Sequence, residues 1–213
     1  MRHIRNVLFD LDGTLVDSES LCNRAFLDLL PQLTDTVESL VRKYRGKKLA
    51  TILADIENRI GIALPAGFER DYRGRVAELF ANELTLNPGV REMLDAVRVP
   101  KCVASSGPLQ KIRQALDATG IAAHFGGNVF SSYEIGSWKP EPGLFQHAAR
   151  AMGFASSNCV VIEDSETGIQ AAHAAGMRAL QYLPDANARP HPLATPFANM
   201  TLLPELLSRY IPS

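Results

Sequence analysis

The sequence predicts an α/β protein with a Rossmann-like, doubly wound parallel sheet as its core and an inserted α-helical cap domain. Short apolar runs rich in β-branched residues recur along the chain, and each is followed by a helical pattern. The runs end in polar or small residues, as strands do where the chain turns. One long stretch near the N-terminus instead has helical periodicity throughout, which predicts the insert.

Five runs are expected to form the strands of the sheet: Val7-Leu8-Phe9, Cys102-Val103-Ala104, Asn128-Val129-Phe130, Cys159-Val160-Val161-Ile162 and Ala179-Leu180-Gln181-Tyr182. Helical patterns lie between and after them, at about 109–119, 142–152 and 167–175. Pro142 suits the first turn of its helix, and Gly176 ends the last of the three. Because parallel strands require crossover connections, this alternation predicts helices on both faces of the sheet.

The stretch from Ser18 to Leu84 predicts the helical insert. Its apolar residues recur at helical spacing and include Phe26, Leu29, Leu30, Leu33, Leu49, Ile52, Leu53 and Ile56. The insert begins only a few residues after the first strand, so we expect it to lie as a cap over the carboxyl end of that strand. The predicted core domain therefore consists of residues 1–16 and 85–213, and the predicted cap domain of residues 17–84.

The composition argues against several classes of partner. The chain of 213 residues has a formal net charge of −1 and no long Lys/Arg run, so it offers no electrostatic surface for nucleic acid or an anionic membrane. Acidic residues interrupt the N-terminal segment MRHIRNVLFDLDG, which therefore predicts neither a signal peptide nor a membrane span. Cys22, Cys102 and Cys159 are too few and too scattered for a disulfide framework or a zinc site. We expect a cytoplasmic protein with reduced cysteines, a monomer or weak homodimer, whose partner is a small molecule.

Polar residues follow four of the predicted strands, at the edge where open α/β sheets place their active sites. These residues are Asp10-Leu11-Asp12-Gly13-Thr14, Ser105-Ser106-Gly107, the segment containing Lys139, and Glu163-Asp164-Ser165. Each alone could be a helix cap or a solvated side chain. Together they bring four carboxylates, a serine pair and a lysine to one edge of one sheet. Carboxylates this close repel, so the arrangement indicates a bound cation and a charged substrate.

This combination resembles the haloacid dehalogenase superfamily of phosphotransferases, and the resemblance covers nearly the whole chain. In that family an Asp-x-Asp-x-Thr motif, a Ser/Thr, a Lys and an acidic pair occur in this order. They stand here as Asp10/Asp12/Thr14, Ser105, Lys139 and Glu163/Asp164. The resemblance implies a Mg²⁺-dependent phosphatase with an α-helical cap that hydrolyses a small phosphorylated metabolite through an aspartyl-phosphate.

The resemblance also implies a role for each acidic residue. Asp10 would attack phosphorus, a covalent route that is open to carboxylates. Asp12 would protonate the leaving alkoxide and later activate water. Mg²⁺ prefers oxygen ligands, and Asp10, the backbone carbonyl of Asp12 and Asp164 would supply them, with Glu163 binding directly or through water.

The remaining motif residues would hold the phosphate. The resemblance assigns phosphate oxygens to Ser105 and to the amide of Ser106, at a helix start where Pro108 fits the first turn. It places Thr14 and Gly107 among the substrate-binding residues as well. Lys139 would neutralise the nucleophile and the phosphate, and its charge is expected to keep Asp10 ionised.

Two features favour hydrolysis over related reactions. Dehalogenase and phosphonatase relatives lack the second aspartate of the first motif, whereas this chain has Asp12. β-Phosphoglucomutase-like members have a cap-hinge histidine, and Cys22 stands at about that place here. A β-phosphoglucomutase-like phosphotransferase stays open as an alternative, as does a non-catalytic protein that binds a phosphorylated metabolite.

The cap carries a basic turn, Arg45-Gly46-Lys47-Lys48, where relatives place a loop that reaches into the active site. Lys47 and Lys48 could bind a second anionic group of the substrate, or the turn could be a solvated surface. Trp138, directly before Lys139, could line the pocket or cover the lysine stem. The basic turn, the Trp-Lys-Pro segment and Val-Asp-Ser-Glu at 16–19 most resemble bacterial 6-phosphogluconate phosphatase-type members, so 6-phosphogluconate is the expected substrate.

Overall fold

The computed structural model describes residues 4–210, so residues 1–3 and 211–213 of the predicted core domain lie outside the description. A six-stranded sheet forms the core, with every pair of neighbours parallel and the strand order β3-β2-β1-β4-β5-β6. The strands are β1 (Asn6–Phe9), β2 (Lys101–Ser105), β3 (Val129–Ser131), β4 (Cys159–Glu163), β5 (Arg178–Tyr182) and β6 (Ala194–Phe197). The predicted fold class is confirmed.

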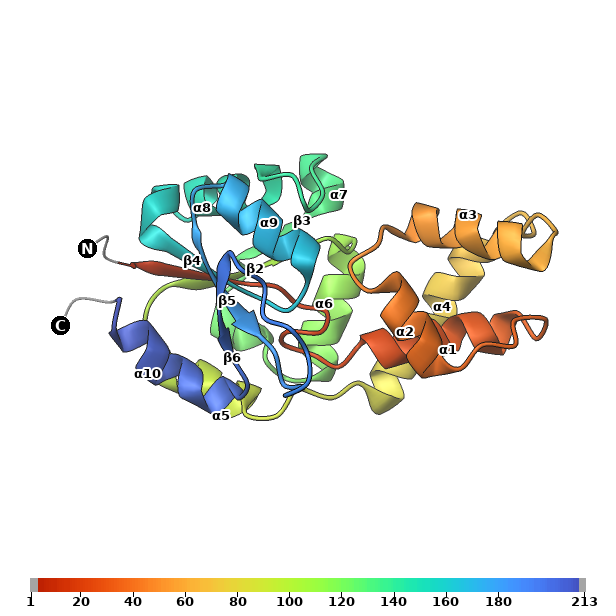
Figure 1. Cartoon of the computed structure of the whole chain (residues 1–213), viewed down its shortest axis with the longest axis horizontal. Helices are drawn as coiled ribbons and strands as arrows, with labels where there is room; N and C mark the ends of the chain where they lie inside the picture. The colour runs from red at the N-terminus through yellow and green to blue at the C-terminus, as the bar shows by residue number, and fades with distance from the viewer. Residues whose placement is uncertain (1–3, 211–213) are drawn as a thin grey trace.

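Helices cover both faces of the sheet (Figure 1). One face carries α5 (Val90–Ala96), α6 (Leu109–Ala118) and α10 (Leu203–Ser208), and the other carries α8 (Gly143–Ala151) and α9 (Glu166–Ala174). The shorter elements are α7 (Ser132–Ile135), η1 (Ala122–Phe125), η2 (Ser156–Asn158) and η3 (Met200–Leu202). Strand periodicity explains the division, since Leu8 packs with the α8 and α9 side chains while Val7 and Phe9 pack with the opposite layer.

The segment 17–84 contains no strand, and its helices stand beyond the carboxyl ends of the core strands (Figure 1). These helices are α1 (Glu19–Leu29), α2 (Val37–Tyr44), α3 (Leu49–Ile60) and α4 (Phe68–Glu83). An aromatic cluster holds three of them together. The Phe26 ring stacks on Tyr72 with a centroid distance of 4.2 Å and meets Tyr44 edge-on at 6.4 Å. This placement is the one expected of a cap, while its limits at residues 17 and 84 stay a prediction.

Several short elements differ from the sequence prediction. Strand β6 was not expected, because its sequence Ala-Thr-Pro-Phe contains Pro196. Proline is tolerated there because β6 is an edge strand. Helix α5 and the single-turn α7 were also not expected, and β3 begins at Val129 rather than Asn128. These elements are too short for their periodicity to be recognised.

Candidate active site

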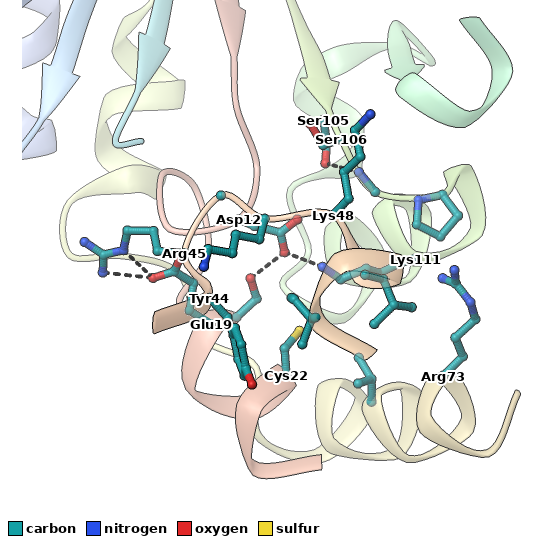
Figure 2. A pocket seen from close by; sticks show the side chains of 18 of the residues that line it. Asp12, Glu19, Cys22, Tyr44, Arg45, Lys48, Arg73, Ser105, Ser106 and Lys111 are labelled. Carbon is teal, nitrogen blue, oxygen red and sulfur yellow. Dashed lines mark hydrogen bonds and ion pairs between the residues drawn. The ribbon is translucent and has the colours of Figure 1, made fainter. Parts of the chain in front are cut away.

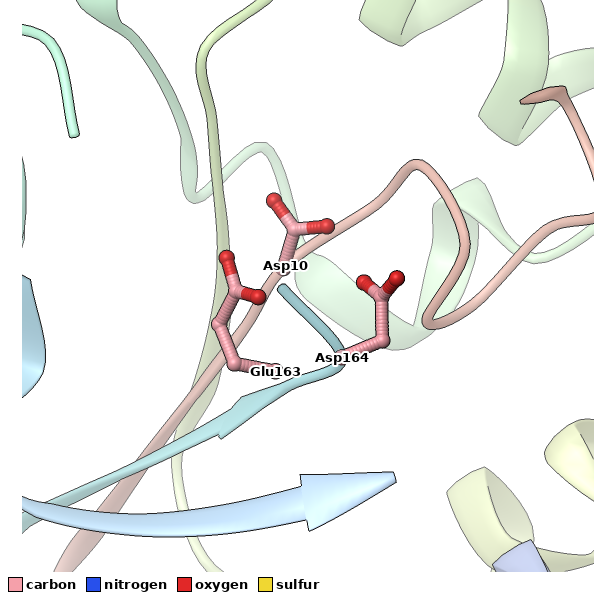
Figure 3. Close-up of side chains that lie close together, drawn as sticks. All are labelled: Asp10, Glu163 and Asp164. Carbon is pink, nitrogen blue, oxygen red and sulfur yellow. The ribbon is translucent and has the colours of Figure 1, made fainter. Parts of the chain in front are cut away.

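Asp10, Glu163 and Asp164 converge at the carboxyl edge of the sheet (Figure 3). The strand register places them there, because Phe9 pairs with Ile162 and the next residues along both strands are Asp10 and Glu163. One carboxylate oxygen from each of the three residues lies within 4.8 Å of the others. Asp10 is 6% exposed and Glu163 is 1% exposed, so the cluster is largely shielded from water.

Lys139 joins this cluster from the loop between α7 and α8. Its Nζ lies 2.5 Å from Oδ1 of Asp10 and 2.7 Å from Oε1 of Glu163. The lysine is 8% exposed, and its ammonium lies over the ring of Phe145, 5.0 Å from the centroid. The predicted neighbours Asp10, Lys139 and Glu163 are therefore in direct contact, and Lys139 is not a solvated surface residue.

The charge balance of the cluster favours a bound cation. Burial raises the pKa of Asp10 to about 7 against the opposing charge of Lys139, and Glu163 adds to the rise. Burial, followed by the charges of Glu163 and Asp10, raises the pKa of Asp164 well above its usual range. Lys139 favours the ionised form of Asp10 and burial opposes it, so the expectation that Lys139 keeps Asp10 ionised stays a prediction. Three converging carboxylates and one ammonium leave excess negative charge, and hard oxygen donors fit Mg²⁺.

Hydrogen bonds fix the other acidic side chains. Thr14 Oγ1 donates to Oδ1 of Asp164 at 3.0 Å, and the amide and hydroxyl of Ser165 donate to Oε2 of Glu163 at 2.7 and 2.9 Å. Thr14 is fully buried and is absent from the cavity lining, so the structure places it as a support for Asp164 and not, as expected, against the substrate. Both oxygens of Glu163 accept hydrogen bonds from protein groups, and whether this residue binds a metal directly or through water stays open.

Ser105, Ser106 and Gly107 form a turn between the end of β2 and the start of α6. Ser105 Oγ accepts a hydrogen bond from the amide of Gly107 at 3.1 Å, and Ser131 Oγ donates to the Gly107 carbonyl at 2.7 Å. All three turn residues line the same cavity as Asp10 and Lys139. Backbone amides at a helix start are suited to anions, and the neighbouring strand supports this turn through Ser131.

Asp12 is not one of the three converging carboxylates. Its Oδ1 accepts a hydrogen bond from Ser18 at 2.5 Å. The same oxygen forms an ion pair with Lys111 Nζ at 2.6 Å, which is visible in Figure 2. Burial opposes the ionisation of Asp12, yet the charge of Lys111 holds the pKa of the carboxyl below its usual value. Neither Ser18 nor Lys111 was identified as a site residue from the sequence. The sequence signal for Lys111 is its place one turn into the helix that follows Ser105, on the same edge of the sheet.

The cap closes the other side of a cavity of about 880 Å³, a size that suits a small metabolite. Arg45 pairs with Glu19 at 2.8 Å (Figure 2) and lies 4.0 Å from Asp164, so the basic turn reaches one residue of the acidic cluster. Lys48 Nζ lies 4.6 Å from the ring centroid of Trp138. Trp138 thus lines the cavity and faces the cap.

Lys47 and Lys48 have no fixed anionic partner in the structure. Both are exposed and line the cavity, and neither pairs with a carboxylate among residues 4–210. Lys47 Nζ lies farther from an aromatic ring than Lys48, at 6.0 Å from the centroid of Tyr44. Of the two lysines, Lys48 is therefore the one that faces a residue of the core.

Comparison with known proteins identifies the family. The chain matches the family described as haloacid dehalogenase-like hydrolase over residues 4–176. It belongs to this family. The hydrolase is 36% identical over 211 residues to a protein named 6-phosphogluconate phosphatase from Escherichia coli K12, covering 97% of this chain and 96% of that protein. The predicted family and the predicted enzyme class, a phosphatase, are confirmed.

Solved structures agree with this haloacid dehalogenase-like assignment. A haloacid dehalogenase-like protein from Agrobacterium tumefaciens matches with a TM-score of 0.82 at 26% identity, covering 97% of this chain and 98% of that one. A family hydrolase from Deinococcus radiodurans, with phosphate and sodium bound, matches with a TM-score of 0.79 at 25% identity and coverages of 99% and 97%. Within residues 4–210, no helix of this hydrolase is long and apolar enough to cross a membrane.

Proposed function

We propose that this chain is a Mg²⁺-dependent phosphatase that hydrolyses a small phosphorylated sugar through an aspartyl-phosphate on Asp10. The observation that supports this most is the position of Asp10. Its carboxylate is held by Lys139 beside two further carboxylates, and it lines the same cavity as the Ser105–Gly107 turn. A nucleophile, a cation site and a phosphate-binding turn thus face one space.

In this proposal Asp10 attacks phosphorus and forms the acyl phosphate. Lys139 neutralises the nucleophile and a phosphate oxygen, and Ser105 with the amide of Ser106 orients the other phosphate oxygens. The buried position of Lys139 strengthens its attraction for the phosphate, because little water screens its charge.

Asp12 supplies the proton transfers in both halves of the reaction. The negative charge of a bound phosphate favours the protonated form of Asp12, which can then donate to the leaving oxygen. After the alcohol has left, the ionised carboxylate beside Lys111 accepts a proton from the water that attacks the acyl phosphate.

The residues that would hold Mg²⁺ are Asp10, Asp164 and the backbone carbonyl of Asp12, with Glu163 binding directly or through water. When bound, the ion neutralises the carboxylates and the phosphate oxygens. Thr14 keeps Asp164 turned toward the cluster through its hydrogen bond at 3.0 Å.

For the substrate, we propose 6-phosphogluconate. The full-length similarity to the Escherichia coli protein of that name supports it, and so do the unpaired ammonium groups of Lys47 and Lys48, which suit a carboxylate at the far end of a sugar phosphate. The β-phosphoglucomutase-like alternative is less well supported, because α1 offers Cys22 and not a histidine at the cap hinge. The non-catalytic alternative is also less well supported, because a protein that only binds a metabolite would not require Asp12 held by Ser18 and Lys111.

A panel of phosphorylated metabolites assayed with Mg²⁺ for phosphate release tests the proposal. We expect kcat/KM to be highest for 6-phosphogluconate and other sugar phosphates that end in a carboxylate. Release from none of the compounds would contradict the phosphatase reaction, and a preference for neutral sugar phosphates would contradict the substrate alone. The expectations of a cytoplasmic location and of a monomer or weak homodimer stay predictions.

A further inference from the structure

The proposed reaction names Lys111 only as the neighbour of Asp12, although the residue pairs directly with that carboxylate. It is the third residue of α6, and its Nζ lies 2.6 Å from Oδ1 of Asp12. The same ammonium lies 5.6 Å from the ring centroid of Phe80 in α4 of the cap. Its side chain is 22% exposed and lines the cavity, so the residue touches Asp12, the cap and the substrate space at once.

The two oxygens of Asp12 have different surroundings. Oδ1 accepts hydrogen bonds from Ser18 and from Lys111. Oδ2 accepts no hydrogen bond from any residue between 4 and 210. A Cβ built on Gly107 would lie 3.9 Å from Oδ2, so this oxygen is on the side of the phosphate-binding turn. The two donors therefore hold the carboxylate by one oxygen and leave the other available.

We infer that Lys111 is a positioning residue which, together with Ser18, fixes Asp12 so that Oδ2 meets the ester oxygen of the substrate. The inference rests on the proposed function. As the bond between Asp10 and phosphorus forms, the P–O ester bond breaks and its electron pair stays on the alcohol oxygen. The proton carried by Oδ2 of Asp12 moves to that oxygen, which leaves as a neutral alcohol. A carboxylate held at Oδ1 does not lose its alignment by rotation before this transfer.

This arrangement makes a prediction about leaving groups. An alcohol or a simple phenol is a poor leaving group and needs the proton from Asp12. A nitrophenolate is stable as an anion and needs it much less. Loss of the ammonium of Lys111 makes Asp12 easier to protonate, but it also frees the carboxyl to rotate away from the ester oxygen. If Lys111 acts by alignment, its loss should slow esters of poor leaving groups selectively, whereas general damage to the site should slow both kinds of ester alike.

The test compares phenyl phosphate with p-nitrophenyl phosphate, two esters of similar shape, in the wild type and in Lys111→Met. The measured quantity is kcat/KM, which reports the steps up to departure of the phenol. We expect kcat/KM to fall about tenfold or more further for phenyl phosphate than for p-nitrophenyl phosphate, since a positioned general acid contributes about 10²–10⁴-fold. Lys111→Arg, which keeps the cation, should restore most of the ratio.

Two further variants keep the test decisive. Ser18→Ala removes the other donor to Oδ1 and should shift the ratio in the same direction, even if Lys111→Met folds poorly. Lys43→Met is the matched control, because Lys43 pairs with Asp55 at 2.7 Å and is not part of the cavity lining. An unchanged ratio in Lys111→Met and Ser18→Ala, with an active wild type, would overturn the role of Lys111. A wild type that hydrolyses neither ester would instead overturn the proposed function.

Discussion

Replacing Lys48 with alanine should lower kcat/KM for 6-phosphogluconate about tenfold and leave p-nitrophenyl phosphate nearly unaffected. Lys48 is at the start of α3 in the cap, and its ammonium lies 4.6 Å from the ring centroid of Trp138 in the core. It therefore stands at the wall of the cavity that faces the catalytic edge of the sheet. Lys47 lies against Tyr44 within the cap, so Lys47→Ala should have a smaller effect.

The magnitude follows from the exposure of the lysine. A hydrogen bond to a charged group contributes about 1.5–3 kcal/mol, and an exposed ammonium belongs at the lower end because water screens it. About 1.4 kcal/mol corresponds to a factor of ten in kcat/KM. Because the contact is screened, raising the salt concentration should also narrow the difference between wild type and Lys48→Ala.

The assay measures kcat/KM for both substrates in the wild type, Lys48→Ala, Lys47→Ala and the control Lys43→Ala. The control residue is a similarly exposed cap lysine that lies outside the cavity lining. If the ratio of the two kcat/KM values is the same in Lys48→Ala as in the wild type and the control, the basic turn is only a solvated surface. The substrate assignment would then lose its structural support.

Other predictions concern the acidic cluster and the packing behind it. EDTA should abolish phosphate release and Mg²⁺ should restore it, whereas Ca²⁺ should inhibit, because the larger ion takes more oxygen ligands and misaligns Asp10. In EDTA the folded state binds the proton of Asp10 more tightly than the unfolded state does, so the melting temperature should fall as pH rises from about 4 to 7. Asp10→Asn should flatten this fall in a thermal-melt series. A steeper fall in the variant would contradict the raised pKa of Asp10. Gly168→Ala should destabilise the protein by about 1–3 kcal/mol, because the new Cβ would lie 1.8 Å from Oε1 of Glu163. Gly74→Ala, in the middle of α4 with open space around it, should instead stabilise by about 0.5–1 kcal/mol in the same melts, and equal destabilisation by both changes would refute the packing argument.

The residues at the strand ends could be predicted because parallel strands share one direction. Asp10 and Glu163 each follow a short apolar run. The register that pairs Phe9 with Ile162 brings these two residues side by side at the carboxyl edge of the sheet. The segment containing Lys139 was predicted to follow the third strand, but the role of Lys139 itself came from the family resemblance, since α7 and a loop separate it from β3. Its position depends on tertiary packing that no local pattern encodes.

Contacts across the cap and core were harder to predict. Lys111 and Asp12 are 99 positions apart in the chain, and Ser18 reaches Asp12 only because α1 begins where the cap leaves the core. Thr14 was assigned to the substrate, but its hydroxyl donates a hydrogen bond to Asp164. These details depend on side-chain direction, which sequence spacing alone does not give.

The measurement that tests the account most directly is the mass of the protein during turnover. Asp12→Asn, mixed with p-nitrophenyl phosphate and Mg²⁺ and quenched in acid, should accumulate one phosphoryl group on the peptide that contains Asp10. The good leaving group lets the first step proceed, while loss of the base slows attack by water. The double variant Asp10→Asn/Asp12→Asn should gain no mass. A phosphoryl group on another residue, or undiminished phosphate release by Asp10→Asn, would contradict Asp10 as the nucleophile.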